Sequence, residues 1–284
     1  MERLNCIICN SDNNNYLKTL SDRYSGDSFK LVKCECGFIF LNPRPDSNQI
    51  QKYYKSDLYE PHSNSNNFFT TIYNFIRDLV FRYRFILLNR YSNDKTVSLL
   101  DIGAGKGDFA RFCKNRACNV TIQDIIKFKS TNDVAYVDHL SSIEDGVKYN
   151  FISLWHSLEH IHNIDELFKN IKRLSTNNTT LFIAIPNRTS IDQIIYNKTW
   201  VGWDVPRHLY HFSYNDINNL LNKNGWCIHT TKILYQDTFY NSLLSLKGNR
   251  LRSIKFIFHS IFMLLMILIN SNFCSSRLYI CRKQ

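Results

Sequence analysis

The chain has 284 residues, of which 44% are hydrophobic, and it carries a formal net charge of +11 with a pI near 9.2. This length and apolar content suit one packed main domain with an accessory module, and they exclude collagen-like, coiled-coil and disordered chains. The positive charge favours an anionic partner such as a phosphate-linked substrate, a nucleic acid or a membrane surface, although a solvated basic surface explains it equally well.

Four of the nine cysteines are clustered near the N-terminus, and these are Cys6, Cys9, Cys34 and Cys36. Residues 1–10 are polar and form no signal peptide, so we expect a cytoplasmic protein whose thiols bind metal instead of forming disulfides. Two close thiolate pairs suit tetrahedral zinc, and a small module gains stability from a metal. We therefore predict a zinc-ribbon-like module over residues 1–60 with a structural zinc. Unligated buried thiols are the alternative.

The rest of the chain divides into a connection and a main domain. Residues 61–95 are predicted to form a linker and a connecting helix, because apolar residues recur at helical spacing from 68 to 90. Over residues 96–284, short apolar runs alternate with helical stretches, which is typical of a parallel α/β sheet. The predicted strands are 98–102, 120–123, 135–137, 151–155, 181–185, 226–233 and 277–281. The predicted helices are 108–115, 164–174 and 214–222.

A glycine-rich loop follows the first of these strands. Residues 98–112 read SLLDIGAGKGDFARF, a strand and an acidic residue followed by three alternating glycines and an amphipathic helix. Glycines permit a sharp turn and close approach of a ligand, and free amides at the helix start favour electron-rich groups. A dinucleotide fingerprint needs its third glycine five residues after the first, where this chain has Asp108, so NAD is disfavoured. The next strand ends at Asp124, a carboxylate that can accept two hydrogen bonds from a diol.

Several longer runs share their pattern with one enzyme family. They are CIIC (6–9), KCECGFIFLNPRP (33–45), FISLWHSLEHI (151–161), AIPN (184–187) and WDVPRHLYHFS (203–213). With the glycine loop, they resemble class I S-adenosylmethionine-dependent methyltransferases that carry an N-terminal cysteine module and are encoded with bacterial polysaccharide-synthesis genes. The resemblance implies a Rossmann-like, seven-stranded α/β sheet with its last strand antiparallel. It also implies S-adenosyl-L-methionine as cofactor and a small-molecule or lipid-linked glycan precursor as acceptor.

The chain departs from the family pattern at two places. Many relatives have a cysteine where this chain has Ala104, and the alanine should be harmless because backbone amides dominate there. Many also have Cys-x-x-Cys as the second metal pair, whereas this chain has the shorter Cys34-Glu35-Cys36. The shorter pair weakens the case for zinc.

The resemblance and the strand ends together predict the site residues. The predicted cofactor-binding residues are Asp101, Gly103, Ala104, Gly105, Gly107, Asp124, Asp138 and Trp155. The predicted catalytic residues are His160, His156 and His208, with His160 as a candidate base because imidazole titrates near working pH. Arg207 and His211 are predicted substrate contacts, since a guanidinium could hold a phosphate or carboxylate.

Each of these assignments has a structural alternative. Glu159 and His160 could form a hydrogen-bonded pair that fixes a loop at a helix start. Arg207, His208 and His211 could form a buried network that joins their loop to the sheet. Asp138 could be a simple turn aspartate.

An unusually apolar helix is predicted over residues 254–270. Its segment 256–269 is interrupted only by His259 and Ser260, which is short of the roughly 20 residues that a membrane-spanning helix needs. It could form a homodimer or pack inside the protein. Nearby basic residues also suit peripheral contact with the inner face of the membrane.

Three functions compete on the sequence alone. Methyl transfer to a sugar or other glycan precursor is favoured by the resemblance. An RNA methyltransferase that grips phosphates with the ribbon and the basic surface is the second interpretation, but residues 154–157 lack the Asn-Pro-Pro-aromatic run of base-amine methylation, so nucleic acid is not the expected partner. A non-catalytic scaffold is the third interpretation. The intact glycine loop together with Asp124 argues against it, because a pure scaffold has no need of both.

Overall fold

The computed structural model describes residues 1–54, 68–92, 97–246 and 252–284. Its centre is a seven-stranded mixed sheet in the order β6-β5-β4-β7-β8-β11-β10. The strands are β4 (Ser98–Ile102), β5 (Asn119–Gln123), β6 (Ala135–Val137), β7 (Tyr149–Trp155), β8 (Ser175–Pro186), β10 (Trp226–Ile233) and β11 (Ser276–Lys283). The last strand, β11, lies antiparallel between β8 and β10, whereas β6, β5, β4, β7 and β8 pair in parallel. The predicted Rossmann-like methyltransferase sheet is confirmed.

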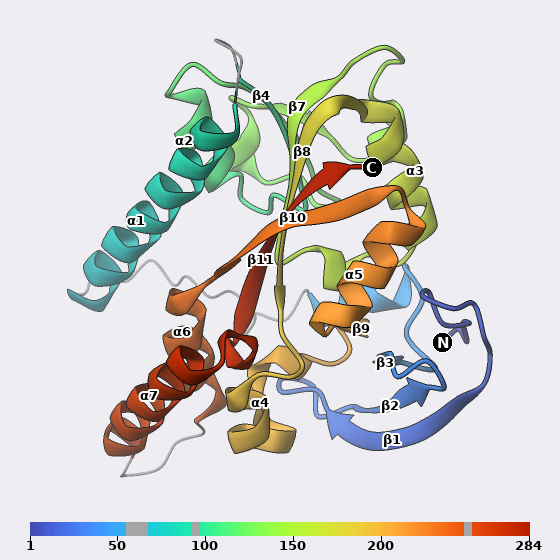
Figure 1. The fold of residues 1–284 in the computed structure, drawn as a ribbon, viewed down its shortest axis with the longest axis vertical. Helices are drawn as coiled ribbons and strands as arrows, with labels where there is room; N and C mark the ends of the chain where they lie inside the picture. The colour runs from blue at the N-terminus through green and yellow to red at the C-terminus, as the bar shows by residue number, and fades with distance from the viewer. Residues whose placement is uncertain (55–67, 93–96, 247–251) are drawn as a thin grey trace.

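Helices cover both faces of this sheet (Figure 1). On one face lie α1 (Phe68–Tyr91) and α2 (Asp108–Lys114), and on the other lie α3 (Ile164–Leu174) and α5 (Tyr214–Lys223). Alternate strand residues point to opposite faces, so Leu99 packs in the α1/α2 core and Leu100 in the α3/α5 core. Both residues are fully buried. The sheet is therefore apolar on both faces, as parallel strands covered on two sides must be.

Local signals define where α3 and α5 begin. The side chain of Asn163 accepts a hydrogen bond from the Glu166 amide and caps α3. Ser213 and Asp216 form a reciprocal capping box at the start of α5. Such caps satisfy amides that lack a partner within the helix and typically contribute about 1 kcal/mol each.

A second, four-stranded antiparallel sheet lies at the N-terminal end of the molecule. It contains β1 (Asn14–Ser21), β2 (Ser28–Cys34), β3 (Ile39–Leu41) and β9 (Tyr210–His211). The fourth strand comes from the WDVPRHLYHFS run of the main domain and pairs with β3. The two parts of the chain therefore share one sheet.

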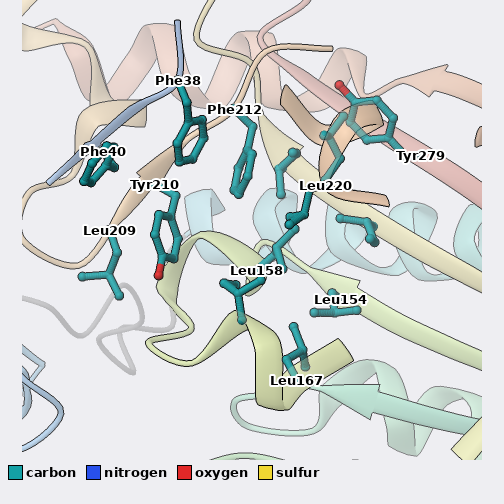
Figure 2. Packing of buried hydrophobic residues seen from close by; sticks show 14 of the residues in the cluster. Phe38, Phe40, Leu154, Leu158, Leu167, Leu209, Tyr210, Phe212, Leu220 and Tyr279 are labelled. Carbon is teal, nitrogen blue, oxygen red and sulfur yellow. The ribbon is translucent and has the colours of Figure 1, made fainter. Parts of the chain in front are cut away.

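Aromatic side chains fill the junction between the two sheets (Figure 2). The Phe38 ring lies 6.1 Å from that of Tyr210 and 5.4 Å from that of Phe212, measured between centroids. Leu158, which follows β7, is fully buried in the same core. The N-terminal module thus packs directly beside the carboxyl end of the central sheet.

The remaining helices are α4 (Ile191–Tyr196), α6 (Tyr235–Ser245) and α7 (Arg252–Ile269). In Figure 1, α6 and α7 lie side by side at the lower left. One face of α7 is buried through Ser260, Met263 and Ile267, and the opposite face exposes large apolar side chains. No helix in the described part of the chain is long and apolar enough to cross a membrane.

The predicted elements of the main domain are all present with shifts at their ends. The strands predicted at 98–102, 135–137 and 226–233 and the helix at 164–174 match in both bounds, and the apolar helix begins at Arg252 instead of 254. The strand predicted at 181–185 is longer, because its first residues continue from α3 along β7. The helices α4 and α6 were missed. Residues 55–60 of the predicted module and 61–67 and 93–95 of the predicted linker lie outside the described residues.

Candidate active site

The glycine loop between β4 and α2 has the backbone that its sequence predicts. Gly103, Gly105 and Gly107 have φ angles of 70°, 56° and 69°, a left-handed conformation that favours glycine. A Cβ on Gly103 would lie 2.4 Å from the Cβ of Ser157, so the loop packs tightly on the segment after β7. A Cβ on Gly105 would meet no protein atom within 4 Å. The loop is therefore closed toward the protein at Gly103 and open at Gly105, where a ligand could approach the backbone.

Asp124 lies at the end of β5, beside this open position. Its carboxylate accepts hydrogen bonds from the amides of Gly105 at 2.8 Å and Ile126 at 3.0 Å. Burial raises the pKa of this carboxyl group, and the two amides oppose the rise. A carboxylate offers about four acceptor sites, so capacity remains for the two hydroxyls of a ribose. The structure thus brings Asp124 and the glycine loop together.

The other two predicted carboxylates differ in position. Asp101 is 3% exposed beneath the loop and accepts a hydrogen bond from the Ser153 hydroxyl, and burial raises its pKa to about 6. It supports the loop from below and does not face open space. Asp138 is exposed after β6, where it accepts a hydrogen bond from the amide of His139. Its backbone carbonyl accepts one from the Gln123 side chain, which places Asp138 at the mouth between β5 and β6.

Trp155 ends β7 and lies at the same edge of the central sheet as the glycine loop. Its ring makes an edge contact with Phe109 of α2, at 5.9 Å between centroids, and Ala104 of the loop packs in the same core. The guanidinium of Arg84, from α1, lies 4.1 Å from the centre of the Trp155 ring. The buried indole nitrogen has no hydrogen-bond partner among the described residues. Arg84 was not among the predicted site residues, because it is one arginine within an apolar helical pattern.

His156 adopts a strained position just after Trp155. Its φ angle is 54°, which is unusual for a residue with a side chain. Its Nε2 lies 3.0 Å from a carboxylate oxygen of Asp237, and its Nδ1 lies 3.7 Å from one of Glu159. Burial opposes its charge, but these carboxylates raise the pKa of His156 to about 10. A histidine that is protonated at working pH cannot accept a proton, so this geometry argues against His156 as the base.

His160 and His208 lie together on the other side of Glu159. Their ring centroids are 4.7 Å apart. Burial, followed by the neighbouring His208, lowers the pKa of His160 to about 4, so that His160 is neutral at working pH. Glu159 is 1% exposed, and its backbone carbonyl accepts a hydrogen bond from the amide of Leu209. This bond ties the segment after β7 to the loop that carries His208.

Arg207 and His211 occupy buried positions. The Arg207 side chain is 0% exposed and forms ion pairs with Asp22 at 2.8 Å and Asp204 at 2.7 Å. His211 is 3% exposed in β9 and makes an edge contact with the Trp203 ring. These contacts match the buried-network alternative, with one difference: the network joins the loop to the N-terminal module, because Asp22 follows β1.

The four N-terminal cysteines converge as the spacing predicts. Their sulfur atoms all lie within 4.8 Å of one another, with Cys6 and Cys36 3.6 Å apart and Cys9 and Cys34 3.5 Å apart. Zinc–sulfur bonds of about 2.3 Å at tetrahedral angles separate sulfurs by about 3.8 Å, so the set fits zinc. A tight turn at Gly37, with φ of 90°, brings the short Cys-x-Cys pair into this geometry.

Two carboxylates that pair with predicted site residues were also missed by the sequence interpretation. Asp237 lies in α6, which was not predicted, and Asp22 lies in a turn of the module. A signal for Asp237 existed, because it follows the carboxyl end of β10 and ligands bind beyond these ends in α/β sheets. No local pattern identified Asp22, whose partner Arg207 is 185 positions away.

Comparison with known proteins gives one family match. A family model described as a methyltransferase domain matches residues 75–231. This match includes the glycine loop, Asp124, the segment after β7 and β9. A search of curated proteins gives no match.

Solved structures with similar folds share little sequence with the chain. Magnesium protoporphyrin IX methyltransferase from Synechocystis PCC 6803 has a TM-score of 0.52 and 14% identity, with 84% of this chain and 100% of that chain covered. Burkholderia thailandensis 1,6-didemethyltoxoflavin-N1-methyltransferase has a TM-score of 0.51 and 13% identity, covering 96% and 99%. An S-adenosylmethionine-dependent methyltransferase from Archaeoglobus fulgidus has a TM-score of 0.50 and 17% identity, covering 77% and 100%. These likenesses confirm the fold.

Proposed function

The chain belongs to the methyltransferase-domain family of class I S-adenosylmethionine-dependent enzymes, and on this premise we propose that it methylates a sugar or other glycan precursor. One observation carries the cofactor assignment. The backbone at Gly105 is open on the side where a Cβ would point, and the carboxylate of Asp124 lies against the same residue. This is the cradle that a nucleoside with a ribose diol and a positive sulfonium requires. The Synechocystis and Burkholderia structures were solved with S-adenosylhomocysteine bound, which supports the assignment.

The bound cofactor supplies a methyl group activated by a sulfonium. Transfer is a direct displacement, so the protein contributes mainly by aligning acceptor, methyl and sulfur. Trp155 and the strained His156, held by Asp237, lie at the cleft beside the loop. Glu159 and the neutral His160 lie next along the chain, and we propose that His160 takes the proton of an acceptor hydroxyl or amine. The acceptor side of the cleft is thus polar, as binding a sugar requires.

The acceptor class is tested by mass spectrometry. The purified protein is incubated with S-adenosylmethionine that carries a deuterated methyl group, together with nucleotide sugars, lipid-linked glycans or RNA. We expect the label in a glycan precursor and not in RNA. Label transfer to RNA alone would contradict the proposed acceptor class, but it would still show that the protein transfers methyl groups.

We further propose that the protein works at the inner face of the membrane on lipid-linked acceptors. A helical stripe of eight large apolar side chains on α7 is exposed, namely Ile254, Ile257, Phe258, Ile261, Phe262, Leu265, Leu268 and Ile269. A second exposed stripe lies on α1, formed by Phe75, Ile76, Leu79, Tyr83 and Ile86. Monomeric soluble proteins rarely expose continuous apolar surfaces of this kind.

The basic residues around α7 favour an anionic bilayer as the surface that binds these stripes. No aspartate or glutamate follows Asp237 in the sequence, whereas lysine and arginine recur up to Lys283. The helix α1 reaches the candidate site directly, because Arg84 lies over Trp155. The helix α7 packs on α6, whose Asp237 pairs with His156. A lipid surface that binds the two stripes would therefore lie beside the site where the methyl group is transferred.

Vesicle flotation tests the membrane proposal. The protein should float with vesicles that contain phosphatidylglycerol and float less at high salt, because exposed charges are screened. Replacing Phe258 and Leu265 by serine should abolish flotation, whereas Tyr16→Ser, an exposed aromatic residue of β1, should leave it unchanged. A wild-type protein that stays in solution as a stable dimer would refute the membrane proposal, because the apolar stripe would then be covered by a second copy.

A further inference from the structure

Glu159, His160 and His208 form a compact cluster beyond the cofactor cleft. One carboxylate oxygen of Glu159 and one nitrogen of each imidazole all lie within 4.8 Å of one another. Glu159 and His160 belong to a short 3₁₀ turn directly after β7, and His208 lies in the loop before β9. The cluster is separate from the four cysteines and from the glycine loop.

Backbone carbonyls orient both imidazoles. The Nδ1 atom of His208 lies 2.8 Å from the carbonyl oxygen of Gly202. A carbonyl oxygen can only accept a hydrogen bond, so the Nδ1 of His208 donates its proton there and leaves Nε2 available as a ligand. The Nδ1 atom of His160 lies 3.0 Å from the carbonyl oxygen of Arg207 and 2.9 Å from the hydroxyl of Tyr54, and these two contacts hold the ring in place. Histidines that bind metals are oriented by their second nitrogen in this way.

The carboxylate of Glu159 has no hydrogen bond to balance its burial. The residue is 1% exposed, and neither carboxylate oxygen has a hydrogen-bond partner within the described residues. The nearest positive group is His156, whose Nδ1 lies 3.7 Å away and whose Nε2 lies closer to Asp237, at 3.0 Å. A buried carboxylate without a hydrogen bond is costly, and such groups in proteins are paired or coordinate metals.

We propose that Glu159, His160 and His208 bind a divalent transition-metal ion. The carboxylate oxygen and the two imidazole nitrogens lie close enough together to share one cation, which would complete the cluster. Two imidazoles and one carboxylate suit zinc or iron(II) better than magnesium, which prefers oxygen ligands. Three protein ligands leave a coordination position open, as catalytic metal sites do.

The site goes beyond the proposed methyl transfer. Ligation would occupy the nitrogen of His160 that could otherwise take a proton from the acceptor. Metal binding can be measured without turnover. A failed binding test would therefore reject the metal site alone, and a failed methyl-transfer assay would reject the proposed function alone.

Cobalt(II) titration of the metal-depleted full-length protein tests the site. Thiolate ligands give cobalt an intense charge-transfer band that nitrogen and oxygen ligands do not give, so the two clusters are distinguished by absorption. We expect a saturable class of cobalt without thiolate character, close to one per chain, and its displacement by zinc. Glu159→Gln and His208→Gln should each remove this class and retain the thiolate band.

Matched variants separate loss of ligands from loss of fold. His139→Gln changes an exposed histidine outside the cluster and should retain both classes of cobalt. Cys6→Ser should lose the thiolate band and retain the second class. Retained binding of S-adenosylhomocysteine shows that a variant is folded. Wild-type protein that binds cobalt only at thiolates, or a second class that persists in both Glu159→Gln and His208→Gln, would overturn the assignment.

Discussion

The Asp124 side chain joins the glycine loop to the end of β5. It already accepts hydrogen bonds from the amides of Gly105 and Ile126, and the remaining lone pairs would accept from the ribose. We predict that Asp124→Ala weakens binding of S-adenosylhomocysteine by about 1–3 kcal/mol, the contribution of hydrogen bonds to a charged group. Equilibrium dialysis measures the change. The control is Asp145→Ala, which changes a 94% exposed carboxylate near Arg173. Equal affinities of Asp124→Ala and wild type for S-adenosylhomocysteine would reject the assignment.

The His156–Asp237 pair predicts how stability depends on pH. The folded pKa of His156, about 10, lies above its ordinary value of 6.5, so the folded protein binds this proton more tightly than the unfolded chain. The stabilisation is complete below pH 6.5 and is lost as the pH rises toward 10. We expect the free energy of unfolding to fall across this window, and to fall less in Asp237→Asn. Urea titrations at several pH values measure both slopes. An NMR titration of His156 with a midpoint near 6.5 would contradict the prediction.

At the residue scale, the sequence predicted types of group better than their partners. The glycines and Asp124 were identified because their spacing along one strand–turn–helix unit is local. His156 was predicted beyond the carboxyl ends of the strands, but its protonation depends on Asp237, which is 81 positions later and lies in a helix without a recognised pattern. Partners of this kind are set by the fold and leave no local signal.

At the element scale, Arg207 links β9 and its loop to the N-terminal module. Its side chain is fully buried, as is that of its partner Asp22. Removing one member of a buried ion pair leaves an uncompensated charge, so we predict that Arg207→Met lowers the free energy of unfolding by about 3–5 kcal/mol. Urea denaturation provides the measurement. Adding Asp22→Leu to Arg207→Met should recover part of the loss, and a single variant as stable as wild type would show that the network contributes little.

The four cysteines predict a structural zinc in the module. Cys6 and Cys34 are buried and come from different segments, so the metal would hold the first loop against the end of β2. We expect close to one sulfur-ligated zinc per chain, lost in both Cys6→Ser and Cys34→Ser, with lowered thermal stability because β3 pairs with β9. Elemental analysis with X-ray absorption at the zinc edge identifies the ligands. Freshly purified protein without sulfur-bound zinc would rule the ribbon site out.

Elements with an apolar pattern of their own were predictable, and an element that depends on a distant partner was not. Most predicted strands and helices of the main domain show an apolar run, alternation or a helical stripe, which is enough to define their type. The strand β9 has only two residues, Tyr210 and His211, and its existence depends on β3 of the module. The WDVPRHLYHFS run therefore suggested a substrate loop, while much of it packs the module onto the sheet.

At the scale of the whole molecule, three features converge on the carboxyl ends of the strands. The glycine loop and Asp124 lie at one side, and the cluster of Glu159 with two histidines lies at the other. One exposed stripe lies on α1, which also carries Arg84, and the other lies on α7, which packs on α6. The fold class could be predicted because the family resemblance covers nearly the whole chain. The sharing of a sheet between module and main domain could not, because it requires pairing between residues about 170 positions apart.

The central claim is that the open backbone at Gly105 holds S-adenosylmethionine. Calorimetric titration with S-adenosylhomocysteine tests it on wild type, Gly105→Val and Gly146→Val. Gly146 also has a positive φ, 92°, and open space around it, but it lies before β7 at the opposite end of the strand, so it controls for backbone strain. We predict one binding site per chain in wild type and in Gly146→Val and no binding in Gly105→Val. Equal binding by all three folded proteins, or none by wild type, would contradict the account.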